Sequence, residues 1–218
     1  MVTPYMKNED IVAEFRRDWS SNLFDRIVGI MNDAKYRKYI LRNVKDNQRV
    51  YFKPIELKEN GNTYILHINT KGRSDFKKNG LLFLIYMCYT RKEGTYVIMR
   101  LSFSEIVKGG DTYCIYPPHL FERYRERVLG QTYLSEMETI FKFFENDNGT
   151  FNSFTKNLEK YPNSLFSVTT NGVMLGEKLN DNIIIAKTYV SFDMLKGNQI
   201  EDKQKLLDSV QEYIKNEM

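Results

Sequence analysis

Three residues near the middle of the chain have the types and spacing of a phosphate-cleaving site. His119 follows two prolines in the stretch YPPHLFERYRERV (116–128), and Arg123 and Arg127 come four and eight residues later. Because proline suits the first turn of a helix, we expect a helix to begin here. The helical period would place the three side chains on one face, within roughly 80° of arc.

This face predicts a metal-independent cleavage of RNA. The positive end of the helix dipole disfavours a protonated imidazole, so a neutral His119 would accept the proton of a ribose 2′-hydroxyl. The guanidinium groups of Arg123 and Arg127 match phosphate oxygens and would stabilise the charge that builds up during cleavage. The sequence predicts no cofactor and no metal site, because its two histidines and two cysteines lack the spacing of metal ligands.

The same stretch also fits an ordinary solvent-exposed helix. Glu122 stands three residues before Arg125, and Arg123 three residues before Glu126, which is the spacing of helical ion pairs. However, Arg123 and Arg127 repel each other at i,i+4, at a cost of a few tenths of a kcal/mol. Both interpretations stay open from the sequence.

Three stretches, HLFERYRER, VTTNGVMLG and IIIAKTYVS, together resemble the RelE/barnase-like ribonuclease toxin superfamily over about residues 115–195. The resemblance implies an endoribonuclease with a helix followed by a strand hairpin. It implies that His119 acts as base or acid and that Arg123 and Arg127 bind phosphate. Lys187 and Thr188 would contribute from the sheet. The residues before 115 lie outside the resemblance.

A second candidate site is the stretch KGRSDFKKNG (71–80), which we expect to form a polar loop. It is rich in basic residues, through Lys71, Arg73, Lys77 and Lys78. Flexible basic loops contact phosphate backbones, so these residues would bind nucleic acid without catalysis. A solvated loop tip is the simpler explanation of the same side chains.

Composition leaves a third interpretation, a non-enzymatic protein-binding module. The chain has 9 Met and 15 Tyr, side chains that serve as anchors in protein interfaces. Its net charge of +4 arises from 32 basic and 28 acidic residues, so the partner need not be RNA. No signal peptide is visible, and the longest apolar run, 81–89, is far shorter than the roughly 20 residues of a membrane helix. The sequence therefore predicts a cytoplasmic protein with no membrane partner.

The order of predicted elements indicates the α+β class. Residues 9–45 have a helical apolar period, with a second helix capped at Ser20 or Ser21. Two antiparallel hairpins follow, with turns in KENG and RKEG, and then a central helical segment that extends through TFNSFTKNLEKYP (150–162), where Pro162 stops it. Strands return between 164 and 192, and a terminal helix covers 201–216. We expect a single α+β domain over 1–218, with subdivision into 1–110 and 111–218 as the alternative.

Overall fold

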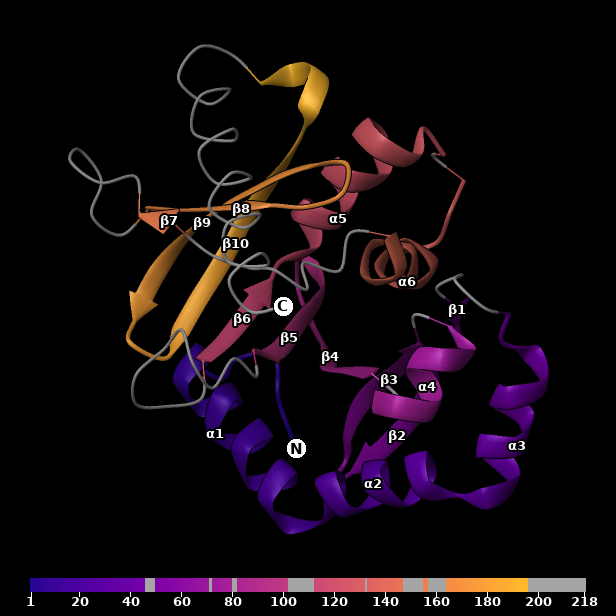
Figure 1. Ribbon diagram of the computed structural model, residues 1–218. Helices are drawn as coiled ribbons and strands as arrows, with labels where there is room; N and C mark the ends of the chain where they lie inside the picture. The colour runs from indigo at the N-terminus through magenta and orange to yellow at the C-terminus, as the bar shows by residue number, and fades with distance from the viewer. Residues whose placement is uncertain are drawn as a thin grey trace. The chain divides into compact units, whose positions relative to one another are not determined.

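The computed structural model describes residues 1–45, 50–70, 72–79, 82–101, 112–131, 133–146, 155–156 and 164–195 (Figure 1). Helices and strands occur together in both halves of the chain, so the predicted α+β class is confirmed. The chain divides into two compact units, Met1–Leu101 and Ser102–Met218. Among the described residues, no helix has the length and apolar character needed to cross a membrane.

The first unit begins with a nearly continuous helical segment, as the apolar period of residues 9–45 predicts. Its parts are α1 (Asn8–Asp18), a π-helical turn η1 (Trp19–Leu23), α2 (Phe24–Asn32) and α3 (Ala34–Asn43). The predicted cap at Ser20 or Ser21 is wrong, because the backbone stays helical through η1 and Ser21 Oγ donates back to the Asp18 carbonyl. The cap lies later, at Asp33, whose carboxylate accepts from the Tyr36 amide at 2.7 Å.

Antiparallel strands follow these helices in the first unit, in the order β1-β3-β4-β5, with β2 also paired to β3. The strands are β1 (Val50–Tyr51), β2 (Ile55–Glu59), β3 (Asn62–Thr70), β4 (Leu82–Arg91) and β5 (Gly94–Leu101). The two predicted hairpins, β2–β3 and β4–β5, are confirmed. At the first turn Asn60 and Gly61 have φ of 48° and 78°, the left-handed pair that a tight hairpin requires.

The predicted polar loop at 71–80 is wrong, because helix α4 (Arg73–Asn79) occupies most of it. Phe76 explains the helix, since its ring is only 2% exposed and the helix contacts β3. The first turn is closed by the Phe76 amide, which donates to the Gly72 carbonyl at 2.9 Å. One buried aromatic side chain thus fixes a segment that is otherwise polar.

The second unit contains a mixed sheet in the order β6-β10-β9-β8-β7. Its strands are β6 (Thr112–Tyr116), β7 (Thr155–Lys156), β8 (Ser164–Val168), β9 (Gly172–Asn180) and β10 (Ile183–Ser191). Strand β10 runs parallel to β6 and antiparallel to β9. The predicted helix over 150–162 is wrong at β7, which pairs with β8, and the remainder of that segment lies outside the described residues. The predicted helix at 201–216 also lies outside them.

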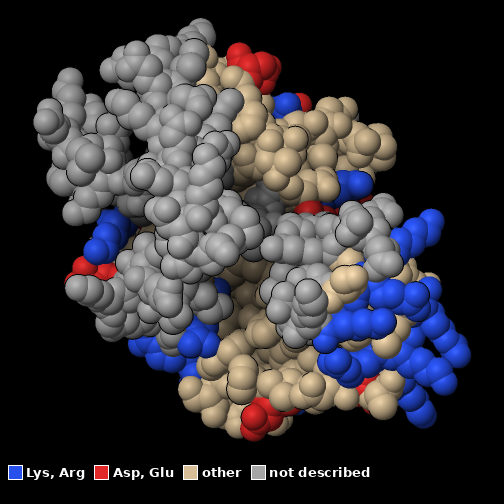
Figure 2. Space-filling view, in the orientation of Figure 1, with Lys and Arg blue, Asp and Glu red and all other residues tan. Residues whose placement is uncertain are grey.

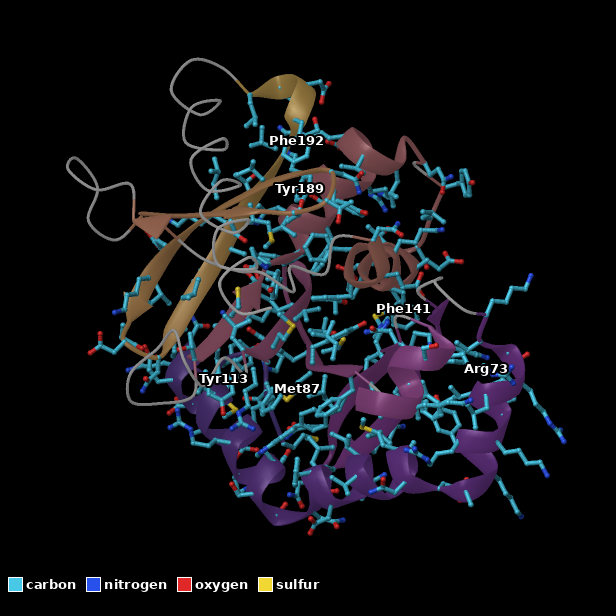
Figure 3. All side chains as sticks on the ribbon, in the orientation of Figure 1. Arg73, Met87, Tyr113, Phe141, Tyr189 and Phe192 are labelled. Carbon is cyan, nitrogen blue, oxygen red and sulfur yellow. The ribbon has the colours of Figure 1, made fainter. Side chains whose placement is uncertain are left out.

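The helices of the second unit pack on the sheet through an aromatic core. They are α5 (Pro118–Tyr124), a π-helical turn η2 (Arg125–Leu129), α6 (Glu136–Asn146) and a 3₁₀ turn η3 (Phe192–Met194). Gly130, with φ of 58°, ends η2. The rings of Tyr124 and Phe143 meet edge to face at 5.1 Å. Tyr124 also meets Tyr189 of β10, which is labelled in Figure 3, at 5.2 Å. These buried rings fix α5 against β10.

Candidate functional site

Helix α5 and the π-helical turn η2 each place one of the predicted catalytic side chains against the backbone of β10. The Nε2 atom of His119 donates a hydrogen bond to the carbonyl oxygen of Lys187. Nη1 of Arg127 donates to the carbonyl oxygen of Tyr189 at 2.5 Å. Because a carbonyl only accepts hydrogen bonds, the proton of a neutral His119 ring must sit on Nε2.

The backbone that accepts these bonds lies where β10 leaves its regular pairing. On one side, Ala186 faces Gly176 and Thr188 faces Leu175, so Lys187 is an extra residue in the β9–β10 ladder. On the other side, pairing with β6 covers only Ile183–Ile185. Side chains of α5 and η2 therefore add hydrogen bonds to backbone carbonyl groups of β10 beside this irregularity.

The other predicted catalytic residues have partners of their own or lie in the strand. Arg123 forms an ion pair with Glu126 at 3.0 Å, as the i,i+3 spacing predicts. The Lys187 ammonium forms an ion pair with Glu177 at 2.6 Å, and Thr188 is half-buried opposite Leu175. The other expected ion pair does not form, since Arg125 donates to the Leu134 carbonyl at 3.0 Å.

These contacts change what the His119 ring can do chemically. With the proton on Nε2, the free base of the ring is Nδ1, and the side chain is exposed to solvent. Arg127 forms a hydrogen bond with the strand backbone, and Arg123 forms an ion pair with a neighbouring carboxylate. The structure thus bonds His119 and Arg127 to the backbone of β10, at Lys187 and Tyr189, while the Lys187 ammonium pairs with Glu177.

The predicted nucleic-acid-binding residues lie in and beside α4. Arg73 and Lys77 are exposed on this helix. Lys71 lies outside the described residues, and so does the side chain of Lys78. The helical backbone replaces the flexible loop on which their prediction was based, so Arg73 and Lys77 are held at fixed positions.

Helix α3 adds basic residues that the sequence interpretation missed. Its stretch AKYRKYILRN contains four basic residues and no acidic one. Lys35, Lys38, Tyr39 and Arg42 are all exposed, and the helical period places them within about 100° of arc. Their i,i+3 and i,i+4 spacing was readable in the sequence, as a run of like charges on one helix face.

Two contacts join α3 to α4. The guanidinium carbon of Arg37 lies 4.8 Å from the centroid of the Phe76 ring. From the other helix, Nη2 of Arg73, which is labelled in Figure 3, donates to the Leu41 carbonyl at 3.1 Å. Arg37 therefore packs against α4. The two contacts also hold the helices next to each other, so their exposed basic side chains lie on neighbouring surfaces.

We call these outward charges the basic face, and Figure 2 shows Lys and Arg gathered over α3 and α4. Its members are Lys35, Lys38, Arg42, Lys45, Arg73 and Lys77, all exposed. Within the part of the chain that the structure describes, none of them forms an ion pair with a carboxylate. The basic face is therefore a positive surface without a carboxylate partner among the described side chains, on a chain whose total charge is only +4.

The remaining reactive side chains are buried or dispersed. His67 is 1% exposed, and its Nε2 lies 2.7 Å from the Tyr86 hydroxyl. Burial lowers the pKa of His67 to about 4 and raises the pKa of the Cys114 thiol to about 12. Cys88 and Cys114 are free thiols, and the described residues contain no group of three or more His, Cys, Asp or Glu that could hold a metal ion.

Comparison of the chain with protein-family models, with curated proteins and with solved structures found no match. The resemblance to ribonuclease toxins therefore rests on residues 115–195 alone. The protein-binding interpretation likewise stays a prediction.

Proposed function

We propose that this protein binds nucleic acid through the basic face of α3 and α4. The observation that carries the proposal is the row of Lys35, Lys38 and Arg42 on one exposed side of α3, without a carboxylate partner among the described residues. Phosphate backbones present a regular line of negative charges, and a line of lysine and arginine side chains neutralises them with release of counterions.

The spacing of these charges favours binding over a purely structural role. Lys35 and Lys38 are three residues apart, and Lys38 and Arg42 are four apart. The two positive charges of each pair therefore repel each other on the helix surface. Lys35 also lies in the first turn, where a positive charge opposes the helix dipole. A bound polyanion would offset all of these costs at once.

Nucleic acid fits this surface better than an anionic membrane does. A helix that lies on a membrane inserts its apolar face about 5–10 Å into the boundary region. The apolar side chains of Ile40 in α3 and of Val44, the residue that caps its C-terminus, are buried within the protein. Tyr39 is the large hydrophobic side chain of α3 that is exposed, at 55%. The face therefore offers charges and one flat ring, without an apolar wedge.

The proposal is tested by fluorescence anisotropy with labelled RNA and DNA oligonucleotides over a range of salt concentrations. Lys38→Gln/Arg42→Gln should weaken binding about 10-fold at 0.1 M salt and reduce the slope of log K against log salt by about 1.4 to 1.8. Lys58→Gln/Lys92→Gln is the matched control, because it removes the same charge from exposed positions away from α3. Equal losses in both double variants, or equally tight binding to anionic vesicles, would reject the basic face as a nucleic-acid site.

The second candidate function is metal-independent RNA cleavage centred on His119. The observation in its favour is that His119 and Arg127 both bond the backbone of β10, at Lys187 and Tyr189, with the imidazole exposed. In this proposal Nδ1 takes the 2′-hydroxyl proton, since Nε2 is occupied. Structured and single-stranded RNA should be cut in EDTA by the wild-type protein and not by His119→Ala. Cleavage that persists in the variant would move the site elsewhere.

A further inference from the structure

Tyr39 stands out among the side chains of the basic face because it is aromatic and 55% exposed. It directly follows Lys38 in sequence, and Lys35 and Arg42 lie one helical turn to either side. Its ring thus has a positive charge on each side along the helix, in the arc that faces solvent.

The Tyr39 ring is supported from within the protein by two other rings. Tyr36 lies 6.3 Å away between centroids, with the two planes only 21° apart. Phe52, which is buried, lies 6.3 Å from Tyr39 and 6.4 Å from Tyr36. These contacts restrict the rotamers of Tyr39, so little side-chain freedom remains to be lost when a ligand stacks on the outer surface of its ring.

We infer that Tyr39 is a stacking platform for a base of single-stranded nucleic acid, with Lys35, Lys38 and Arg42 binding the flanking phosphates. The inference rests on the proposed function and names its ligand class. Proteins that bind single strands combine a positive track for the backbone with exposed aromatic rings for the bases. In a duplex the base faces are covered by their neighbours, so a ring on a convex helix surface reaches only unpaired bases.

Charge decides between this ligand and an apolar protein partner. An exposed tyrosine that anchors a protein interface is expected in a patch from which charged side chains are depleted. Tyr39 has the opposite surroundings, with three positive charges within one helical turn that form no ion pair with a described carboxylate. A partner that is both flat and anionic matches this surface.

Abasic oligonucleotides separate stacking from charge, because they keep every phosphate and lack the bases. The wild-type protein should bind a 12-nucleotide single strand about 5- to 100-fold more tightly than its abasic counterpart, and more tightly than the corresponding duplex. Tyr39→Leu should remove this preference and leave binding of the abasic strand unchanged. Tyr39→Phe should retain it, since the ring and not the hydroxyl makes the contact.

The outcomes distinguish the two proposals. If the wild-type protein binds normal and abasic strands equally, and Lys38→Gln/Arg42→Gln weakens both, the basic face is a phosphate site and the stacking inference is wrong. If no strand binds at all, the proposed function itself fails. Thermal unfolding curves of each variant establish that α3 is intact, and the wild-type comparison of normal with abasic strands depends on no substitution.

Discussion

The imidazole of His119 caps the carbonyl group of Lys187, the extra residue in the β9–β10 ladder. Arg127, two turns further along the same helical segment, caps the carbonyl of Tyr189. The pairing of β10 with β6 ends at Ile185. Beyond that point, side chains of α5 and η2 donate hydrogen bonds to the β10 backbone. The residue types that suggested catalysis also serve to hold a helix against a strand edge.

Removing these caps should destabilise the protein by different amounts. We expect His119→Ala to lower the free energy of unfolding by about 1 kcal/mol and Arg127→Ala by about 2 kcal/mol, because the arginine donor is charged and partly buried. Urea denaturation of the full chain measures both. Arg123→Ala is the control on the same helix, and its exposed ion pair should contribute less than about 0.5 kcal/mol. Equal effects from all three variants would contradict the capping role.

A buried carboxylate should be the most sensitive polar residue of the first unit. The side chain of Asp18 is 0% exposed and accepts hydrogen bonds from Asn60, Asn62 and Tyr64 at 2.7–2.8 Å. Asp18→Asn keeps the shape but turns an amide donor toward two other amide donors. We expect it to lower the free energy of unfolding by about 2–4 kcal/mol, measured by denaturant titration at pH 7.

The pH dependence of Asp18 gives an independent check. Burial alone would raise the pKa of Asp18, but the hydrogen bonds from Asn60, Asn62 and Tyr64 outweigh it and hold that pKa below its usual value. A depressed carboxyl pKa stabilises the fold above the unfolded pKa, near 4, and this stabilisation is lost as the pH falls through the folded value. Asp18→Asn should therefore flatten the acid limb of the stability curve below pH 4, and an unchanged limb would contradict this account.

His67 should govern stability in a higher pH range. Burial lowers its pKa to about 4, whereas the unfolded chain takes up the proton near 6.5, so the unfolded state binds more protons between these values. Stability should therefore fall as the pH is lowered from 6.5 to 4, by up to about 3 kcal/mol from this residue. His67→Gln should remove most of that decline. Thermal unfolding across this range measures it, and parallel curves for variant and wild type would exclude His67 as the cause.

Turn chemistry made the hairpins readable from the sequence. Asn60-Gly61 and the Gly94 turn combine residues that accept left-handed backbone with flanking strand periodicity, and both hairpins form as predicted. Helix α4 was not readable in this way, because its only apolar side chain is Phe76 and one residue shows no period. The partner that buries Phe76 comes from tertiary structure, which local patterns do not contain.

For the candidate sites too, local patterns were predictable from the sequence and tertiary contacts were not. The like charges Lys35, Lys38 and Arg42 were visible as a helix pattern, but their proximity to α4 depends on the contact of Arg73 with Leu41. The partner of His119 was unpredictable for a different reason. Its acceptor is a backbone carbonyl at a strand irregularity, and carbonyl groups carry no signature in the side-chain sequence.

Glycines of β9 should tolerate substitution far less well than a helical glycine. A Cβ at Gly176 would collide with the Ile185 carbonyl oxygen of β10, so the paired backbones would have to separate. We expect Gly176→Ala to lower the free energy of unfolding by more than about 2 kcal/mol. Gly29→Ala, inside α2 with no atom within 4 Å, should instead raise it by about 0.5–1 kcal/mol through better helix propensity. Denaturant titration of both variants compares them, and a neutral Gly176→Ala would show that the β9–β10 ladder is looser than its register indicates.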